Sequence, residues 1–427
     1  MSRLSRADAS HVLSWLRHRF GVVTERIALC ESQSAGMGVS ASSRCEAGDV
    51  LLAVPAQAWE PFSALHARAT CPPRALAEVE RHTARLGGGA NQLADAVLLA
   101  NAIANTTAST EHAPYLSRLP MPDVPLLWPP PLRAALLQGS SAERSAQQQA
   151  ALSASCYSTL STALTEAGGS PAPTEQLFQW AQALLLSRAH SGHGKPLALV
   201  PGLDLLNHGG ADASADVRFD DATANFLLVA RRAHAREEEV TIDYGTDASH
   251  RLLRLYGFVL DETADEGVRT DADYDSVPPP QPREEVSLSL MPPTAELAKA
   301  SDDVQQAWRG HVDALAACGL SGSTLRLLVD ADGSLLMPML ETQPADATVE
   351  TALLVLSAAI DAQLQSQADG IAACQAVYSA QGAPAEYKAR AKLALRMHLR
   401  ERSVLMAAEV ETQRRLRACT SSGMQRS

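Results

Sequence analysis

The 427-residue sequence has few lysines, no clustered cysteines and no long apolar runs. Only four of its 36 basic residues are lysine, and the formal net charge is -12. A chain of this charge repels polyphosphate unless a local basic patch intervenes, so we expect no nucleic-acid partner. No stretch reaches the apolar length that spans a bilayer, and residues 1–20 lack the unbroken apolar segment of a signal peptide. These absences predict an intracellular protein without a membrane partner, and they do not distinguish cytoplasm, nucleus and plastid.

The cysteine pattern bears on metal binding. Seven cysteines are spread along the chain, odd in number and never spaced as Cys-x-x-Cys, which is typical of a reducing compartment and of a protein without structural zinc. His190 and His193 stand three residues apart, but no cysteine or carboxylate that could complete a metal site is near them in the sequence. We therefore expect no metal.

Composition and periodicity predict a folded α+β protein of several parts. Hydrophobic residues make up 46% and charged residues 20% of the chain, as in ordinary globular proteins, and the length exceeds one ordinary core. Residues 36–55 have the pattern of two strands joined by a turn, and the strand pattern returns from residue 197, where residues 240–245 alternate apolar and polar at period two. Elsewhere apolar residues recur at helical spacing. We expect an amino-terminal helix with the first strands in residues 1–60, a helical insert in 61–185, a second β-rich segment in 186–270, a Pro-rich linker in 271–285 and an all-α carboxy-terminal lobe in 286–427.

The most informative segment contains Asp204 and the pair Asn207-His208. It is followed 36 residues after His208 by Tyr244-Gly245, and then by Tyr256-Gly257-Phe258. Taken singly, an Asn-His pair after a strand is usually a turn, and a tyrosine at a strand end is usually a core residue with a paired hydroxyl. The ordered set is far more specific than any of its members.

In this order the motifs resemble the SET-domain methyltransferases, in particular the group that contains the plant RuBisCO large-subunit lysine methyltransferase and its actin-histidine-methylating relatives. Recognisable motifs cover about a third of the chain. They are Gly36-x-Gly38-x-x-Ala41, Gly48 to Pro55, Pro114-Tyr115, Leu119-Pro120, Ser187-Arg188-Ala189, Val200-Pro201, Asp204-x-x-Asn207-His208, Tyr244-Gly245 and Leu252 to Val259. The resemblance implies a small-sheet β-rich SET domain split by the helical insert and followed by a substrate-binding helical lobe.

The resemblance also implies roles for ten residues. The expected S-adenosyl-L-methionine (AdoMet) contacts are Ala35, Gly36, Met37, Arg188, Asn207 and His208. The expected substrate contacts are Arg188, Asp204, Phe219, Tyr244 and Tyr256, of which the two tyrosines are the expected catalytic residues. Phe219 is placed only by its distance of eleven residues from His208, in a region where loop lengths vary.

Methyl transfer from a sulfonium needs a neutral, in-line nucleophile and no metal. A free lysine costs roughly 4 to 5 kcal/mol to present as the neutral amine near pH 7, and burial lowers that cost. Aromatic faces and oxygen atoms around the methyl group stabilise the cationic donor, and Tyr244 and Tyr256 can supply both. We therefore expect a monomeric AdoMet-dependent protein-lysine N-methyltransferase with a non-histone protein substrate. The alternatives are a protein-histidine N-methyltransferase of the same fold and an inactive SET scaffold that binds a protein partner.

Four positions depart from the pattern of the group. Glu237 stands at a usual glycine, His250 at a usual asparagine, Gly209 at a common serine, and Gly192 where a relative has an arginine. The chain also lacks a cysteine cluster after Phe258, which argues against the histone-type subgroup with a zinc-binding segment.

Overall fold

A computed structural model describes most of the chain. The described residues are 5–32, 36–86, 90–106, 112–168, 171–192, 195–245, 248–260, 283–290, 302–318, 320, 324–330, 334–336 and 346–424. The chain forms two compact units, the first from residues 1–128, 147–246 and 255–257, and the second from residues 129–146, 247–254 and 258–427. Residues 129–146 of the predicted insert thus group with the carboxy-terminal segment.

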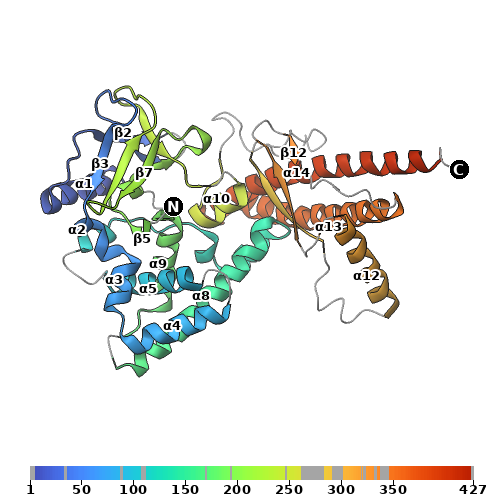
Figure 1. Ribbon diagram of the computed structural model, residues 1–427, viewed down its shortest axis with the longest axis horizontal. Coiled ribbons are helices and arrows are strands. Elements are labelled where there is room, and N and C mark those ends of the chain that lie inside the picture. The colour runs from blue at the N-terminus through green and yellow to red at the C-terminus, as the bar shows by residue number, and fades with distance from the viewer. Residues whose placement is uncertain are drawn as a thin grey trace. The chain divides into compact units, whose positions relative to one another are not determined.

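The first unit contains the β-rich region around two small sheets (Figure 1). One sheet has the order β1-β2-β9-β6, with β9 antiparallel to β2 and parallel to β6. The other has the order β3-β8-β7, and a separate hairpin joins β4 to β5. The strands are β1 (Ile27–Ser32), β2 (Gly36–Ala41), β3 (Val50–Val54), β4 (Ala189–Gly192), β5 (Lys195–Leu199), β6 (Asn207–His208), β7 (Ala215–Asp220), β8 (Asn225–Ala230) and β9 (Glu239–Ile242).

The two strands expected between residues 36 and 55 are confirmed, but they do not pair with each other. β2 pairs with β1 and β9, whereas β3 pairs with β8. The turn between them contains Gly48, whose φ of 91° favours glycine. The connection therefore carries the chain from one sheet to the other.

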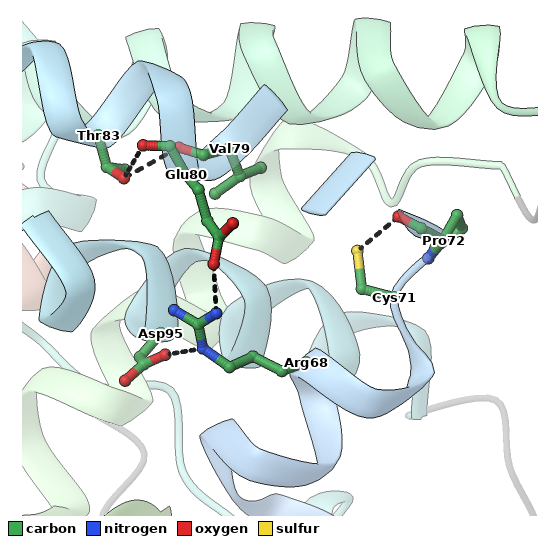
Figure 2. A network of polar contacts seen from close by, with 7 residues as sticks. All are labelled: Arg68, Cys71, Pro72, Val79, Glu80, Thr83 and Asp95. Atoms are coloured by element: carbon green, nitrogen blue, oxygen red, sulfur yellow. Dashed lines mark hydrogen bonds and ion pairs between the residues drawn. The ribbon is translucent and has the colours of Figure 1, made fainter. Parts of the chain in front are cut away.

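Helices make up most of the remainder of the first unit. They are α1 (Arg6–Phe20), α2 (Ala56–Trp59), α3 (Ala64–Thr70), α4 (Pro73–Leu86), α5 (Ala90–Thr106), α6 (Ala113–Leu116), α9 (Glu175–Arg188), most of α8 (Ser141–Glu166), and the short 3-10 helices η1 (Glu60–Phe62), η2 (Pro125–Leu127), η3 (Leu203–Leu205) and η4 (Gly210–Asp212). Figure 2 shows how Arg68 of α3 ties three helices together by ion pairs with Glu80 of α4 and Asp95 of α5.

The second unit is mainly helical and carries one small sheet. Its helices are α7 (Pro130–Leu137), the start of α8, residues 249–254 of α10 (Ser249–Tyr256), α12 (Asp302–Ala317), and the two long helices α13 (Asp346–Ser379) and α14 (Ala385–Met424), which pack along each other (Figure 1). Its sheet has the order β10-β11-β12, with strands β10 (Glu285–Ser289), β11 (Thr324–Val329) and β12 (Leu335–Leu336).

The all-α expectation for this lobe was therefore incomplete. β11 alternates exposed and buried residues, and Leu325, Leu327 and Val329 face a core with Val286 and Leu288 of β10. The strands have at most six residues and lie between longer helices, which is why helical periodicity dominated the prediction. Most of the predicted linker, up to residue 282, lies outside the described residues, and its last residue, Glu285, begins β10.

Candidate functional site

The sheet order places Asn207 and His208 beside the end of β9. β6 pairs in parallel with Thr241 and Ile242, and Tyr244 follows two residues later. The sequence motifs around 207 and 244 are therefore brought together by strand pairing, as their resemblance to the SET pattern predicts.

Asn207 is held by a carboxylate that the sequence analysis did not assign to the site. Its amide Nδ2 donates to Glu239 Oε1 at 2.8 Å. A Cβ atom at Gly38 would lie 2.4 Å from Asn207 Nδ2 and 2.8 Å from Glu239 Oε1, so only glycine at this position of β2 leaves room for the pair. Gly38, the second glycine of the Gly36-x-Gly38 motif, therefore lets the backbone of β2 lie close to these two side chains.

His208 is oriented by backbone N–H groups. Its Nδ1 accepts from the amides of Tyr244, at 3.2 Å, and Gly210, at 3.4 Å. Because Nδ1 is an acceptor, the neutral ring carries its proton on Nε2. The ring lies 5.0 Å from the Tyr244 ring, at 32° to it.

Tyr244 and Tyr256 form a pair of neighbouring, tilted rings. Their centroids are 4.6 Å apart and their planes differ by 32°. The Tyr244 hydroxyl donates to the carbonyl oxygen of Leu206 at 2.6 Å, and the Tyr256 hydroxyl donates to the carbonyl oxygen of Tyr244 at 3.0 Å. Burial raises the pKa of both phenols above the ordinary value, so both hydroxyls stay protonated at neutral pH.

Arg188 and Asp204 belong to a second, deeper group. The Arg188 guanidinium donates to the backbone carbonyl oxygen of Asp204 at 2.6 Å. The Asp204 carboxylate accepts from the Tyr115 hydroxyl at 2.7 Å and from the Gly202 amide at 3.0 Å, and the residue is only 8% exposed. Burial raises the pKa of Asp204 while the neighbouring charge of Arg188 lowers it. Asp204 thus braces the turn between β5 and β6, and its contact with a substrate stays a prediction.

Phe219 lies in an aromatic group on the other sheet. Its ring contacts are with Trp59, at 5.8 Å, and Phe226, at 5.1 Å. Among the described residues, no ring contact links Phe219 to Tyr244 or Tyr256. Its predicted contact with a substrate stays a prediction.

Only part of the expected cofactor loop is described. Ala35 lies outside the described residues. Gly36 begins β2 with a φ of 87°, a left-handed conformation that favours glycine, and Met37 is half-buried against the core of the first unit. His193, which raised the question of a metal, also lies outside the described residues. In the described part of the chain, no group of three or more His, Cys, Asp or Glu side chains could hold a metal ion.

The structure explains one of the four departures, Gly209, and shows the surroundings of Glu237 and His250. Glu237 adopts a φ of 67°, the conformation that a turn glycine takes at lower cost. At Gly209 a Cβ would lie 2.3 Å from Thr241 Oγ1, so serine does not fit beside Thr241. His250 is buried in the second unit, and burial lowers its pKa to about 4, so the ring is neutral. Gly192 ends β4, and nothing in the structure explains the absence of an arginine there.

Comparison with solved structures gives the fold. Rubisco LSMT bound to AdoMet superposes with a TM-score of 0.66 over 96% of this chain and 93% of that one, at 17% sequence identity. The SET domain of LSMT bound to lysine and AdoHcy superposes with a TM-score of 0.65, over 97% of this chain and 92% of that one, also at 17% identity. The chain has the SET-domain fold of the LSMT type. The match spans both the SET region and the carboxy-terminal helical lobe, as expected.

A sequence relative is consistent with this fold. A human protein, N-lysine methyltransferase SETD6, is 28% identical over 255 residues, which is 54% of this chain and 51% of that protein. The match thus spans about half the length of the relative. No family model matches the sequence. In the described residues, no helix is long and apolar enough to cross a membrane.

Proposed function

We propose that this SET-fold chain is an AdoMet-dependent protein-lysine N-methyltransferase that acts on a non-histone protein. The observation that carries the proposal is the Tyr244–Tyr256 ring pair, 4.6 Å apart, beside the fixed Asn207-His208 pair. Similar proteins support it, since human SETD6 is named an N-lysine methyltransferase and LSMT structures contain AdoMet or AdoHcy and lysine. The substrate protein, the monomeric state and an intracellular location belong to the same proposal.

The residues around β2 and β6 fit the methionine part of AdoMet. Gly36 carries no side chain, so a ligand can approach the backbone at the start of β2 closely. Asn207 offers an amide oxygen and His208 a ring N–H, which suit an ammonium and a carboxylate respectively. AdoMet supplies a methyl group on a sulfonium, which is electrophilic without a metal.

Tyr244 and Tyr256 provide the surroundings for the transfer. Their faces and the oxygen atoms at Leu206 and Tyr244 place negative electrostatic potential where a cationic donor is bound. Both hydroxyls are already engaged by backbone carbonyls, so the rings are preorganised and need no rearrangement. The two tyrosines are buried, and a buried site favours the neutral amine over the ammonium. The neutral amine is the form that attacks the methyl group.

Tyr256 favours lysine over histidine as the acceptor. A tyrosine ring 4.6 Å from Tyr244 leaves less room for an acceptor than a smaller side chain would, which suits a slim aliphatic amine better than an imidazole. Histidine methylation by the same fold is the alternative that a test of the acceptor must decide.

Binding of AdoMet tests the proposal first. Titration calorimetry of the full chain with AdoMet should give one site per chain, unchanged by EDTA. Asn207→Ala should weaken binding by about 2- to 13-fold, the equivalent of one hydrogen bond worth 0.5–1.5 kcal/mol, and should affect binding more than the stability of the fold.

The matched control is Asn105→Ala, an exposed asparagine on α5, which should bind as the wild type does. A folded wild-type sample that binds no AdoMet, or that loses AdoMet to the chelator, would refute the proposal. Equal affinity of Asn207→Ala and wild type would remove Asn207 from the site.

A further inference from the structure

We propose that Glu239 is a positioning residue that fixes the side-chain amide of Asn207, so that its Oδ1 meets the α-ammonium group of the cofactor's methionine part. This inference rests on the proposed function, because it assigns a role within the AdoMet site. It predicts that Glu239 governs affinity for ligands that carry an α-amino acid and leaves the affinity for the nucleoside part alone.

The hydrogen bond itself sets the orientation. A carboxylate oxygen only accepts, so the atom of Asn207 that faces Glu239 at 2.8 Å must be the donor Nδ2. The acceptor Oδ1 is then directed away from Glu239, and among the described residues it has no hydrogen-bond partner. An ammonium group is the ligand chemistry that a presented amide oxygen binds.

Three strands are arranged to permit this contact. Glu239 begins β9 opposite Ser40 of β2, and Asn207 begins β6 on the other side of β9. Gly38 of β2 lies against the side chains of Asn207 and Glu239, and a Cβ atom at this position would overlap them. The contact therefore depends on residues from three separate parts of the sequence.

Glu239 differs from the two acidic residues before it. Glu238 is engaged by Arg232 and by the Ala235 amide, and Glu237 is exposed in the left-handed turn with Arg236 3.5 Å away. In the described part of the chain, no ion pair links Glu239 to a basic residue. A run of three glutamates is usually a solvated turn, but Glu239 is half-buried and bonded to Asn207.

The charge of Glu239 reaches its neighbours on the sheet. Burial raises the pKa of the Cys30 thiol on β1, and the negative charge of Glu239 raises it further. The same negative potential favours a cationic group beside Asn207. Hydrogen bonding and electrostatics thus point to the same ligand group.

The test compares two ligands by calorimetry of the full chain. AdoHcy carries the α-amino acid, and 5′-methylthioadenosine lacks it. Glu239→Leu should lower the affinity for AdoHcy about tenfold, as expected for loss of a hydrogen bond to a charged group. It should change the affinity for methylthioadenosine less than about twofold. Glu239→Gln should fall between Glu239→Leu and wild type, because a glutamine oxygen still accepts from Asn207 without the charge. The control, Glu237→Gln, should match wild type.

A double-mutant cycle shows whether Glu239 acts through Asn207. In an Asn207→Ala background, Glu239→Leu should change the AdoHcy affinity less than about twofold, since the amide it positions is gone. If Glu239→Leu fails to fold, the same cycle with Glu239→Gln decides.

The outcomes separate this inference from the proposed function. Wild-type protein that binds neither AdoMet nor AdoHcy would overturn the proposed function and this inference with it. Wild-type protein that binds AdoHcy, with unchanged affinity in Glu239→Leu and Glu239→Gln, would overturn the role of Glu239 alone. The role of Glu239 would also be overturned if Glu239→Leu weakened the binding of AdoHcy and of methylthioadenosine equally. The same holds if Glu239→Leu weakened AdoHcy binding as much in the Asn207→Ala background as in the wild type.

Discussion

Individual side chains of the site are held in one orientation by hydrogen bonds to the backbone. The Tyr244 hydroxyl donates to Leu206, and the Tyr244 amide donates to His208. One tyrosine therefore fixes its own ring and the neighbouring imidazole. Hydrogen bonds within the chain thus fix the orientation of both rings.

Tyr244→Phe should lower kcat on the order of 100-fold while changing AdoMet affinity less than about twofold. A hydroxyl that stabilises charge mainly in the transition state appears in turnover and not in ground-state binding. Single-turnover transfer of labelled methyl, with calorimetry on the same samples, measures both.

Tyr157→Phe is the matched control, because that hydroxyl also donates to a backbone carbonyl, of Pro173, at 2.9 Å. It should leave turnover unchanged. Full activity of Tyr244→Phe, with the control also active, would make Tyr244 a packed strand-end residue and nothing more.

The motifs named four residues that the structure brings together, but not all of their partners, and the roles of the four stay predictions. Asn207, His208, Tyr244 and Tyr256 stand in short ordered motifs, and strand pairing and ring packing bring them together. Glu239 was missed because its contact with Asn207 spans 32 residues and follows from the register of β6 against β9. A run of three glutamates gives no sign of which one faces inward.

At the element scale, the short strands were the hardest to predict. β6 and β12 have two residues each, which is too short to show the alternation of apolar and polar residues that marks a strand in a sequence. The long helices α13 and α14 lie in the carboxy-terminal lobe, which was expected to be helical from its periodicity. Long helices are easier to predict because the helical spacing of their apolar residues repeats over many turns.

Within the second unit, a buried carboxyl holds the start of α8. Glu401 of α14 accepts from the Ser141 amide and from Gln367, and it is fully buried. Burial raises its pKa from 4.5 to about 8, and the charge of Glu284 adds to the rise. Gln367 Oε1 is buried without a hydrogen-bond partner, and a protonated Glu401 can donate to it once the Gln367 amide turns.

Glu401→Gln should flatten the pH dependence of stability. Because the folded state holds this proton more tightly than the unfolded chain, the contribution is fully present below pH 4.5 and is lost as pH rises through about 8. The substitution keeps the group neutral at every pH. The difference in unfolding free energy between variant and wild type should therefore grow by on the order of a few kcal/mol from pH 5 to pH 8.5.

Chemical unfolding at pH 5, 7 and 8.5 measures that difference, with the exposed Glu386→Gln on the same helix as control. Parallel pH profiles for Glu401→Gln and wild type would show that the buried carboxyl is not the titrating group.

At the scale of the whole molecule, the fold class was predictable and the grouping of segments was not. Ordered motifs predicted a SET domain with a helical insert and a helical lobe, and the superposition on LSMT confirms that fold. Residues 129–146 and 247–254 join the carboxy-terminal unit through contacts such as Ser141 with Glu401 and Ser249 with Glu284. Such contacts pair residues up to 260 positions apart, and no local pattern encodes them.

Methyl transfer to a protein side chain is the decisive assay for the proposed activity. The full chain is incubated with a cell lysate and isotopically labelled AdoMet, alongside Tyr244→Phe, and labelled sites are mapped by peptide-level mass spectrometry. We expect labelled methyl groups on lysine of a discrete protein substrate, and far fewer of them with Tyr244→Phe. Label on histidine with lysine unlabelled would contradict the lysine assignment, and no labelled protein from an enzyme sample that binds AdoMet would contradict the account as a whole.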